Sequence, residues 1–225
     1  MWPAWSRSNE EHVNPIFIIG LPRSGSTLIE SILTSSKENI ISFGECNVFN
    51  VSILDQIGPK IYSEKFDNKK FKFRINKESL NKSVLEKYSQ YSDIKHEKFV
   101  DKSLENFFNI ELIRSIYPKA KFIHTYRNPL DSVISIYQSM LPELSWTHHI
   151  EDILSYMDSY YKVLKYFKSK YPEIIMDIKL EEFTEKSELL TKKLLDFCEL
   201  GWSENILKFY KRRDLYSKTL SFNQI

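Results

Sequence analysis

The feature that most limits how this chain can fold is a short apolar run followed directly by a glycine-bounded turn. Residues 16–19 read Ile-Phe-Ile-Ile, a pattern that fits a strand buried on both faces of a parallel sheet. Residues 20–27 read Gly-Leu-Pro-Arg-Ser-Gly-Ser-Thr, and a helix pattern follows them. Backbone N–H groups of such a turn and of the helix N-terminus point toward one place, so the turn is predicted to bind an anion.

Strand and helix patterns then alternate along the rest of the chain. This alternation is typical of a parallel sheet covered on both faces, so the sequence predicts a three-layer, P-loop-like α/β fold with a mostly parallel central sheet of about five strands flanked by helices. The later strands are predicted at 40–43, 98–101, 121–126 and 174–178. Helices are predicted after residue 26, at about 46–56 and 77–92, between 103 and 118, from 129, at about 148–170, and as a closing pair.

Two of the predicted helices carry an apolar stripe that predicts their buried face. Ser103 caps the first of them, Pro118 ends it, and the stripe repeats every four residues. Its members are Leu104, Phe108, Leu112 and Ile116. The second helix starts at a cap made by Asn128 and Pro129, because proline at the first helical position loses no hydrogen bond. Its stripe is Leu130, Val133, Ile134 and Tyr137.

The charge balance and the cysteine count exclude several classes of protein. Lys and Arg number 32 and Asp and Glu number 30, giving a net charge of +2. A general nucleic-acid-binding protein would carry a marked basic excess, so no nucleic-acid partner is expected. Two cysteines, Cys46 and Cys198, are too few for a disulfide framework or a four-ligand zinc site. No metal site is predicted.

The same sequence gives expectations for location and domain organisation. No apolar run approaches the roughly 18 residues that a membrane span needs. Residues 1–7 lack a basic segment followed by an apolar one, which is the pattern of a secretory signal. We therefore expect a cytoplasmic protein in which a polar lead-in at 1–14 precedes one domain at 15–225.

The turn at 20–27 almost satisfies the phosphate-binding pattern G-x-x-x-x-G-K-S/T, but Ser26 stands where that pattern has lysine. In nucleotide triphosphatases this lysine reaches the β- and γ-phosphates, so its absence disfavours a triphosphate ligand. Arg23 returns a cation to the turn, in the planar form that suits oxyanions. The turn alone predicts a phosphate or sulfate site without naming the ligand.

Two segments resemble one family, the sulfotransferases that use 3′-phosphoadenylyl sulfate. The Pro-Arg-Ser-Gly-Ser-Thr turn resembles the family's 5′-phosphosulfate loop, in particular that of the bacterial branch often found behind tetratricopeptide repeats and of the tyrosylprotein sulfotransferases. Residues 126–135, Tyr-Arg-Asn-Pro-Leu-Asp-Ser-Val-Ile-Ser, resemble the segment that holds the donor's 3′-phosphate. The donor-binding residues that the resemblance implies are Pro22, Arg23, Ser24, Gly25, Ser26, Thr27, Arg127 and Ser135.

The resemblance also implies catalytic residues for transfer of a sulfuryl group to a hydroxyl acceptor. Phe43-Gly44-Glu45 is similar to the segment that supplies the catalytic base in the tyrosylprotein type, which makes Glu45 the expected base. Asp101-Lys102 is similar to the segment whose lysine contacts the sulfuryl group, so Lys102 is expected to stabilise the developing charge with Arg23. Residues 219–224 resemble a segment that reaches over the donor and would contribute Ser221. No metal is expected, because the leaving phosphate is held by the turn.

The chain also departs from the family's pattern. Tetratricopeptide repeats are absent, and Leu180 stands where relatives have a tyrosine that could contact adenine. The chain stops at Ile225 where relatives continue, so the resemblance implies a domain truncated at its C-terminus. His124 does not follow the Lys-x-His pattern of histidine-dependent members, and a packed strand-end residue is expected there.

Several alternatives stay open at this level. Glu45 could be an ordinary helix-start carboxylate and Lys102 a solvated lysine. A P-loop kinase or nucleotide triphosphatase would use Asp101 to hold magnesium, and a donor-binding module would bind the nucleotide without transfer. The acceptor class and the oligomeric state are not predicted. Residues 58–96 and 138–160 are expected to recognise the acceptor, and the basic residues at 69–74 favour either an acidic acceptor or a solvated face.

Overall fold

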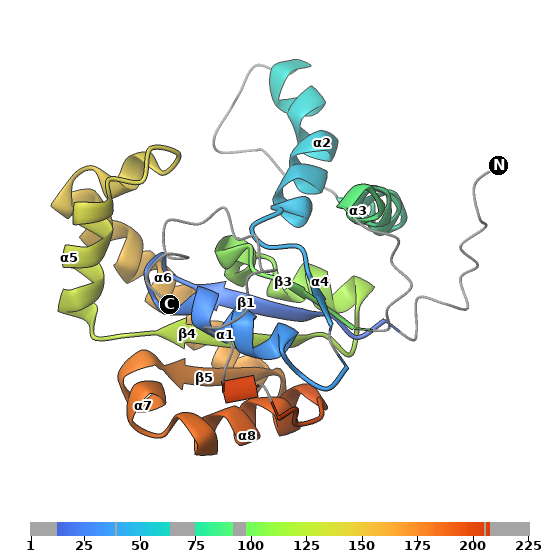
Figure 1. Ribbon diagram of the computed structural model, residues 1–225. Helices are drawn as coiled ribbons and strands as arrows, with labels where there is room; N and C mark the ends of the chain where they lie inside the picture. The colour runs from blue at the N-terminus through green and yellow to red at the C-terminus, as the bar shows by residue number, and fades with distance from the viewer. Residues whose placement is uncertain (1–12, 39, 64–74, 92–97, 205, 208–225) are drawn as a thin grey trace.

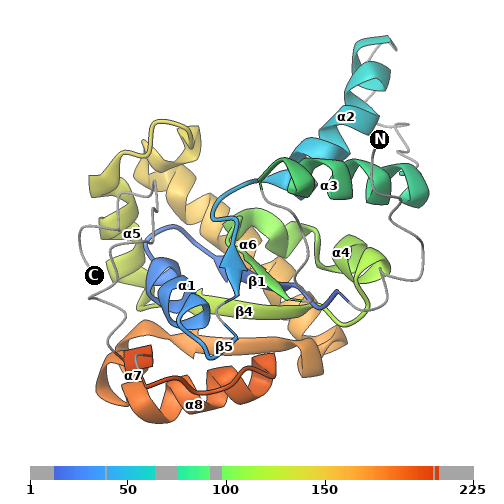
Figure 2. The ribbon, with the colours of Figure 1, turned by 45° about the vertical axis from the view of Figure 1, so that its right-hand side comes forward.

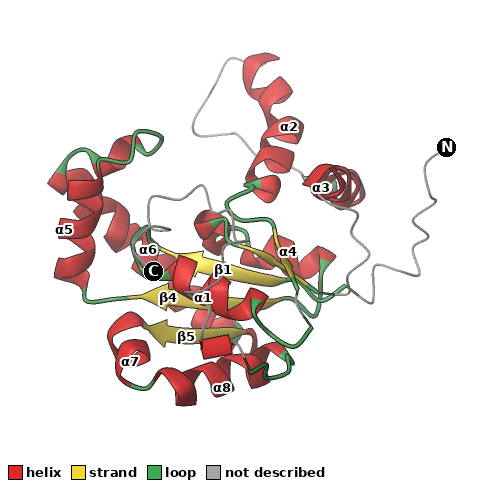
Figure 3. Cartoon of the chain, viewed as in Figure 1, coloured by secondary structure: helices red, strands yellow, loops and turns green. Residues whose placement is uncertain are grey.

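The central element of the fold is an all-parallel sheet, with strand order β2-β3-β1-β4-β5 (Figure 1, Figure 3). A computed structural model describes residues 13–38, 40–63, 75–91, 98–204 and 206–207. The strands are β1 (Ile16–Gly20), β2 (Ile41–Ser42), β3 (Phe99–Asp101), β4 (Lys121–Tyr126) and β5 (Ile175–Lys179). The predicted α/β class, the parallel sheet and all predicted strand positions are confirmed.

Helices cover both faces of this sheet, as predicted. Their bounds are α1 (Ser26–Thr34), α2 (Val48–Ser63), α3 (Lys77–Tyr91), α4 (Ile110–Ile116), α5 (Pro129–Ser139), α6 (Ile150–Lys170), α7 (Leu180–Glu185) and α8 (Ser187–Cys198). Short 3₁₀ turns lie at η2 (Leu104–Phe108), η3 (Ser145–Thr147) and η4 (Pro172–Ile174). Figure 2 shows α7 and α8 on one side of the sheet and α2 and α3 together, far from them.

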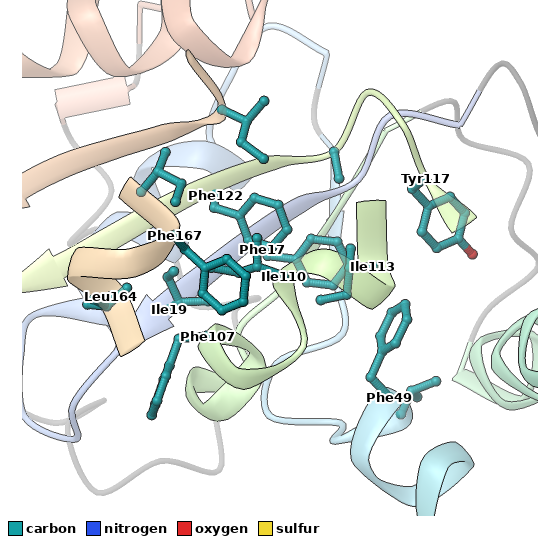
Figure 4. Packing of buried hydrophobic residues seen from close by; sticks show 14 of the residues in the cluster. Phe17, Ile19, Phe49, Phe107, Ile110, Ile113, Tyr117, Phe122, Leu164 and Phe167 are labelled. Carbon is teal, nitrogen blue, oxygen red and sulfur yellow. The ribbon is translucent and has the colours of Figure 1, made fainter. Parts of the chain in front are cut away.

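The apolar run at residues 16–19 forms most of β1, the central strand of the sheet. This strand lies between β3 and β4, and all five of its residues are buried. Phe17 and Ile19 face the cluster that contains residues of α2, α3, α4 and α6, and Phe17 stacks on Phe122 with ring centroids 5.4 Å apart (Figure 4). Ile16 and Ile18 face a second cluster with residues of α1 and α8. A strand covered on both faces therefore needs apolar residues at every position.

The prediction of a single helix between residues 103 and 118 is wrong. The segment instead forms the 3₁₀ turn η2, then Asn109, then the short helix α4. Asn109 donates its side-chain amide to Asn50 Oδ1 at 2.7 Å, which ties the junction to α2. A 3₁₀ turn repeats every three residues, so the predicted four-residue spacing does not follow the buried face. The buried side chains are Phe107, Ile110 and Ile113, whereas Phe108 is half exposed.

The stripe predicted on α5 is wrong as well, although the predicted cap is present. The Asn128 side chain accepts a hydrogen bond from the Leu130 backbone N–H at 2.9 Å, and Pro129 is the first helical residue. The helix contacts α6 and buries Ser132 and Ile136. Three of the four predicted core residues, Leu130, Ile134 and Tyr137, are exposed instead. Spacing identified an apolar face here, but the packing of α5 uses another face.

His124 is packed inside the fold, as expected for a strand-end residue. It is 3% exposed, and its Nδ1 lies 2.7 Å from Oδ1 of Asp177, its neighbour on β5. Its Nε2 pairs with the hydroxyl of Tyr160, while Lys168 forms an ion pair with Asp177 at 2.6 Å. Lys168 Nζ also lies 3.0 Å from His124 Nδ1. Burial lowers the pKa of His124 below its usual value of 6.5, against the opposing effect of Asp177.

This lowered pKa predicts acid-sensitive stability. Below pH 6.5 the unfolded chain binds a proton at His124 that the folded chain still excludes, so the free energy of unfolding decreases as the pH falls through that window. We expect His124→Gln to lose less stability than the wild type between pH 7.5 and 5.5, measured by urea unfolding. His149→Gln changes an exposed histidine and should behave as the wild type. An equal loss in all three proteins would contradict this prediction.

Candidate functional site

The segments that carry the predicted site residues meet at the carboxyl edge of the sheet. Parallel strands all end on one edge, so the segments that follow β1, β2, β3 and β4 come together there. A cavity of about 360 Å³ lies at this edge. Its lining residues are Gly20, Pro22, Arg23, Ser26, Thr27, Glu45, Asn47, Ser103, Leu104, Glu105, Leu141, Pro142, Glu143, Leu144, Trp146 and Tyr156.

The anion turn has the backbone shape that its glycine predicts. Gly25 has a φ of 88° and precedes the first residue of α1, so the turn ends directly at a helix N-terminus. A Cβ atom at Gly25 would lie 2.7 Å from Cδ1 of Leu180. Arg23 also has a positive φ, 66°, which costs an arginine on the order of 1 kcal/mol and is typical of functional sites. This strained backbone places Arg23 on the cavity wall.

The two predicted phosphate segments contact each other. Arg23 Nε donates a hydrogen bond to Ser135 Oγ at 3.3 Å, which joins the turn after β1 to the helix after β4. Arg127, at the start of that helix, pairs with Asp131 at 3.5 Å, and its buried Nε has no partner among the described residues. An unsatisfied buried N–H donor is costly, but Arg114 Nε on α4 has the same property. Arg127 differs from Arg114 in that it lies directly before the N-cap residue of α5.

Lys102 lies at the centre of a buried charge cluster. Its side chain is 1% exposed, and its Nζ lies 3.1 Å from Glu45 Oε1 and 3.2 Å from Glu30 Oε2. The same Nζ lies 3.4 Å from Thr27 Oγ1 in the anion turn. Glu45 is about half exposed, at 47% of its side-chain surface, and lines the cavity. The structure therefore brings Lys102, Glu45 and the anion turn together, and the reading of Lys102 as a solvated lysine is wrong.

Glu30 belongs to this cluster and was not predicted from the sequence. It lies on α1, is 7% exposed, and accepts a hydrogen bond from Ser42 Oγ at 2.6 Å through its second oxygen. A signal was present: residues three apart on a helix share a face, so Glu30 lies beside Thr27 of the anion turn. No local pattern indicates its partner, because Lys102 is 72 residues further along the chain.

Asp101 is placed for a structural role. It is fully buried and accepts hydrogen bonds from the Ser103 backbone N–H at 2.7 Å, the Asn106 amide at 3.4 Å, the Tyr88 hydroxyl and the Cys46 thiol. Burial raises the pKa of Asp101, and the donors around it oppose that effect. A carboxylate surrounded by four protein donors is not available to a magnesium ion at the cavity, which disfavours the triphosphatase alternative.

The remaining predicted residues lie as follows. Pro22, Ser26 and Thr27 line the cavity, whereas the hydroxyl of Ser24 is turned toward Thr125 on β4, at 2.7 Å. Residues from 138–160 contribute to the lining as expected, but none of the described residues from 58–96 does. Ser221 and its segment 219–224 lie outside the described residues, as do the basic residues at 69–74.

Comparison with known proteins agrees with this arrangement. The sequence profile described as "Sulfotransferase family" matches residues 15–204. The chain belongs to the sulfotransferase family. A protein of Aquifex aeolicus (strain VF5) described as uncharacterized is 30% identical over 232 residues, which cover 94% of this chain and 28% of that protein. The chain thus spans less than a third of that relative's length.

Solved sulfotransferase structures share the fold. A sulfotransferase domain from the olefin synthase of Synechococcus PCC 7002 has a TM-score of 0.57 at 17% identity, covering 99% of this chain and 86% of that domain. The sulfotransferase from Alicyclobacillus acidocaldarius has a TM-score of 0.55 at 17% identity, covering 84% of this chain and 81% of that protein. Similarity at this level of identity establishes the fold of this sulfotransferase family member, and nothing about its acceptor.

The described part of this sulfotransferase family member contains neither a helix that could span a membrane nor a metal-binding group of side chains. None of its described helices combines the length and the apolar character needed to cross a bilayer. Within the described ranges, no three or more His, Cys, Asp or Glu side chains form a group that could hold a metal ion.

The shape of the anion turn can be tested by comparing two glycines. Gly44 also has a positive φ, 60°, but a Cβ there would lie no closer than 4.0 Å to Glu30 Oε1. Gly44→Ala should therefore cost about 1–2 kcal/mol of stability through backbone strain alone. Gly25→Ala should cost about 1 kcal/mol more, because its methyl group also overlaps the end of the Leu180 side chain, which must shift. Urea unfolding measures both, and equal losses would mean that the turn relaxes freely around position 25.

Proposed function

We propose that this protein transfers a sulfuryl group from 3′-phosphoadenylyl sulfate to a hydroxyl acceptor. The observation that carries the proposal is the contact between the two phosphate segments. The Arg23–Ser135 hydrogen bond joins them at the cavity that Glu45 lines, with Lys102 bonded to Glu45. A ligand that reaches both segments needs phosphate at two separate positions, which this donor has and an ordinary nucleoside triphosphate lacks.

The donor's binding groups follow from the positions of the segments. The turn from Pro22 to Thr27, with the N-terminus of α1, would hold the 5′-phosphosulfate by backbone N–H groups. Ser24 and Ser26 then act through the backbone of the turn. Arg127 and Ser135 would hold the 3′-phosphate, because a guanidinium and a hydroxyl beside a helix start suit a dianion.

The expected reaction is an in-line displacement at sulfur. The acceptor oxygen forms a bond to sulfur as the bond between sulfur and the bridging phosphate oxygen breaks, and 3′,5′-phosphoadenosine leaves. Glu45 takes the acceptor's proton, and its half-exposed position on the cavity wall allows this contact. Lys102 and Arg23 stabilise the charge that develops on the leaving phosphate oxygen, and Ser221 would assist. The similarity of residues 43–45 to the base-bearing segment of the tyrosylprotein type supports a place near the bacterial repeat-associated and tyrosylprotein branches.

Two alternatives predict other behaviour. A triphosphatase would need the lysine that Ser26 replaces and a magnesium ligand, yet Asp101 is committed to protein donors. A donor-binding module without activity would bind 3′,5′-phosphoadenosine and transfer nothing. Binding and transfer must therefore be measured separately on the same preparation.

The test combines calorimetry with a transfer assay. We expect 3′,5′-phosphoadenosine to bind without added metal, and Arg127→Ala to weaken it about 10- to 100-fold, since a charge-assisted hydrogen bond contributes roughly 1.5–3 kcal/mol. With labelled donor and a panel of sugar, phenol and aliphatic alcohol acceptors, Glu45→Gln should lower kcat by about 10²–10⁴.

Matched variants control for nonspecific effects. Arg114→Ala removes an arginine from α4, which precedes β4 and so lies at the opposite edge of the sheet, and should leave nucleotide binding unchanged. Glu188→Gln removes an exposed carboxylate on α8 and should keep normal turnover. Preferential binding of ATP with magnesium would overturn the proposal. Nucleotide binding without transfer to water or any acceptor would favour the binding module.

A further inference from the structure

One buried carboxylate contacts both parts of the proposed catalytic apparatus. Glu30 Oε2 lies 3.2 Å from Lys102 Nζ, and Oε1 accepts the Ser42 hydroxyl proton at 2.6 Å. Ser42 Oγ in turn accepts a hydrogen bond from the Gly44 backbone N–H at 3.1 Å. The Lys102 backbone N–H donates to the Gly44 carbonyl oxygen at 2.9 Å, which closes the ring of contacts. Glu30 therefore links the helix of the anion turn to the lysine and to the turn before Glu45.

We propose that Glu30 is a positioning residue for both Lys102 and Glu45, a role that rests on the proposed function. Its charge gives the buried lysine a permanent partner. Without it, Glu45 would be the one carboxylate bonded to Lys102 among the described residues, and that ion pair would hold Glu45 away from the acceptor proton. Through Ser42, Glu30 also fixes the positive φ of Gly44, which sets where the Glu45 side chain begins.

Loss of the Glu30–Lys102 ion pair should have different effects if the pair is only structural and if it positions catalytic groups. Loss of a structural pair lowers stability and decreases every activity in proportion to the folded fraction. Loss of a positioning pair lowers kcat while nucleotide binding stays intact, because a displacement near 1 Å is enough to cost about 10²-fold. The two arms can also be separated, since Ser42→Ala removes the contact to Gly44 and leaves the ion pair with Lys102.

The experiment measures kcat, the donor KM, the Kd for 3′,5′-phosphoadenosine and thermal stability for three variants. Water serves as the acceptor where none is known, through release of 3′,5′-phosphoadenosine from the donor. Glu30→Gln keeps the shape of the side chain and should lower kcat about 10²-fold, with KM and Kd within about threefold of the wild type. Ser42→Ala should lower kcat about tenfold and Ser42→Thr, which retains the hydroxyl, should restore it.

The outcomes separate this proposal from the proposed function. An active wild type with unchanged kcat in Glu30→Gln overturns the positioning role, as does a kcat that falls only with the folded fraction. A wild type that binds the nucleotide and never releases it from the donor overturns the proposed transfer itself. If Glu30→Gln does not fold, the kcat of Ser42→Ala compared with that of Ser42→Thr tests the positioning role by itself.

A second, independent observation concerns the charge of the acceptor. Five residues that line the cavity and lie outside the anion turn are here named the acceptor wall: Leu104, Glu105, Glu143, Trp146 and Tyr156. Trp146 and Tyr156 stack in parallel with centroids 3.9 Å apart. Tyr156 donates to Glu105 Oε1 at 3.0 Å, and burial beside this carboxylate raises the pKa of Tyr156, so the phenol stays protonated.

The charges on the acceptor wall point to one class of acceptor. Among the described lining residues, three carboxylates, Glu45, Glu105 and Glu143, accompany a single cation, Arg23, which belongs to the donor side. Lys102, which contacts Glu45 but is not among the lining residues, is balanced by the carboxylate of Glu30. A bound donor adds further negative charge. An anionic acceptor would be repelled there, whereas an ammonium group is attracted by carboxylates and by aromatic faces. We infer that the acceptor is a ring-bearing hydroxyl compound with a positively charged amine, an inference that also rests on the proposed function.

A matched series of phenols tests this inference. Tyramine, 4-ethylphenol and 3-(4-hydroxyphenyl)propanoate present the same phenol with a positive, a neutral and a negative substituent. We expect kcat/KM to fall in that order, by about tenfold or more from first to last, and Glu105→Gln or Glu143→Gln to shrink the ratio. For any compound without turnover, calorimetric binding to the protein saturated with 3′,5′-phosphoadenosine supplies the same ranking.

The result that overturns the acceptor inference is specific. Equal or better use of the carboxylate compound, or a ratio that neither variant changes, means that the acceptor wall does not select by charge. Failure of the wild type to bind 3′,5′-phosphoadenosine at all, measured first on the same preparation, would instead be a failure of the proposed function.

Discussion

The arrangement of the candidate site depends on one positive charge that is removed from water. Lys102 is fully buried at the end of β3, and its Nζ is satisfied by Glu30 from α1 and Glu45 from the segment after β2. Removing one partner of a buried ion pair typically costs about 3–5 kcal/mol, because the remaining charge stays buried. Helix α1, the Gly44 turn and β3 are therefore held in a single relative placement, and the anion turn at the start of α1 is held with them.

This buried lysine also accounts for the serine at position 26. In nucleotide triphosphatases the lysine at that place extends along the phosphate chain from the start of the helix. Here the cation comes from the neighbouring strand and reaches the turn at Thr27, with Nζ 3.4 Å from Oγ1. Under the proposed function, a cation that approaches from this side would lie at one end of the bound donor, beside Glu45, rather than along a polyphosphate tail.

The sequence predicted the elements and their order well and the details of packing less well. The apolar run at 16–19 and the turn at 20–27 are local signals, because a strand buried on both faces and a helix start have characteristic residues. Arg127 and Ser135 are predicted through the resemblance, and the structure brings Ser135 into contact with Arg23. The spacing of apolar residues gave wrong predictions where tertiary contacts determine which face is buried. Asn109 divides one predicted helix, and α5 packs on Ser132 and Ile136 rather than on its apolar stripe.

The residues missed by sequence reasoning are those whose meaning depends on distant partners. Glu30 looks like a surface residue on an amphipathic helix until β3 brings Lys102 against it. Glu105 lies outside the segments predicted to recognise the acceptor, whereas its partner Tyr156, 51 residues further along the chain, lies within the predicted segment 138–160. Contacts between residues so far apart in the chain depend on the order of strands in the sheet. The sequence predicted the α/β class of the fold but not that order.

Two adjacent residues at the end of β3 have different uses. Asp101 is the last residue of β3 and Lys102 follows it directly, yet their side chains have different partners. Lys102 contacts the anion turn, whereas Asp101 accepts hydrogen bonds from Ser103 and Asn106 and fixes the start of η2, which carries Glu105 into the acceptor wall. Under the proposed function, one strand end thus positions the donor side through the cation Lys102 and the acceptor side through the carboxylate Asp101.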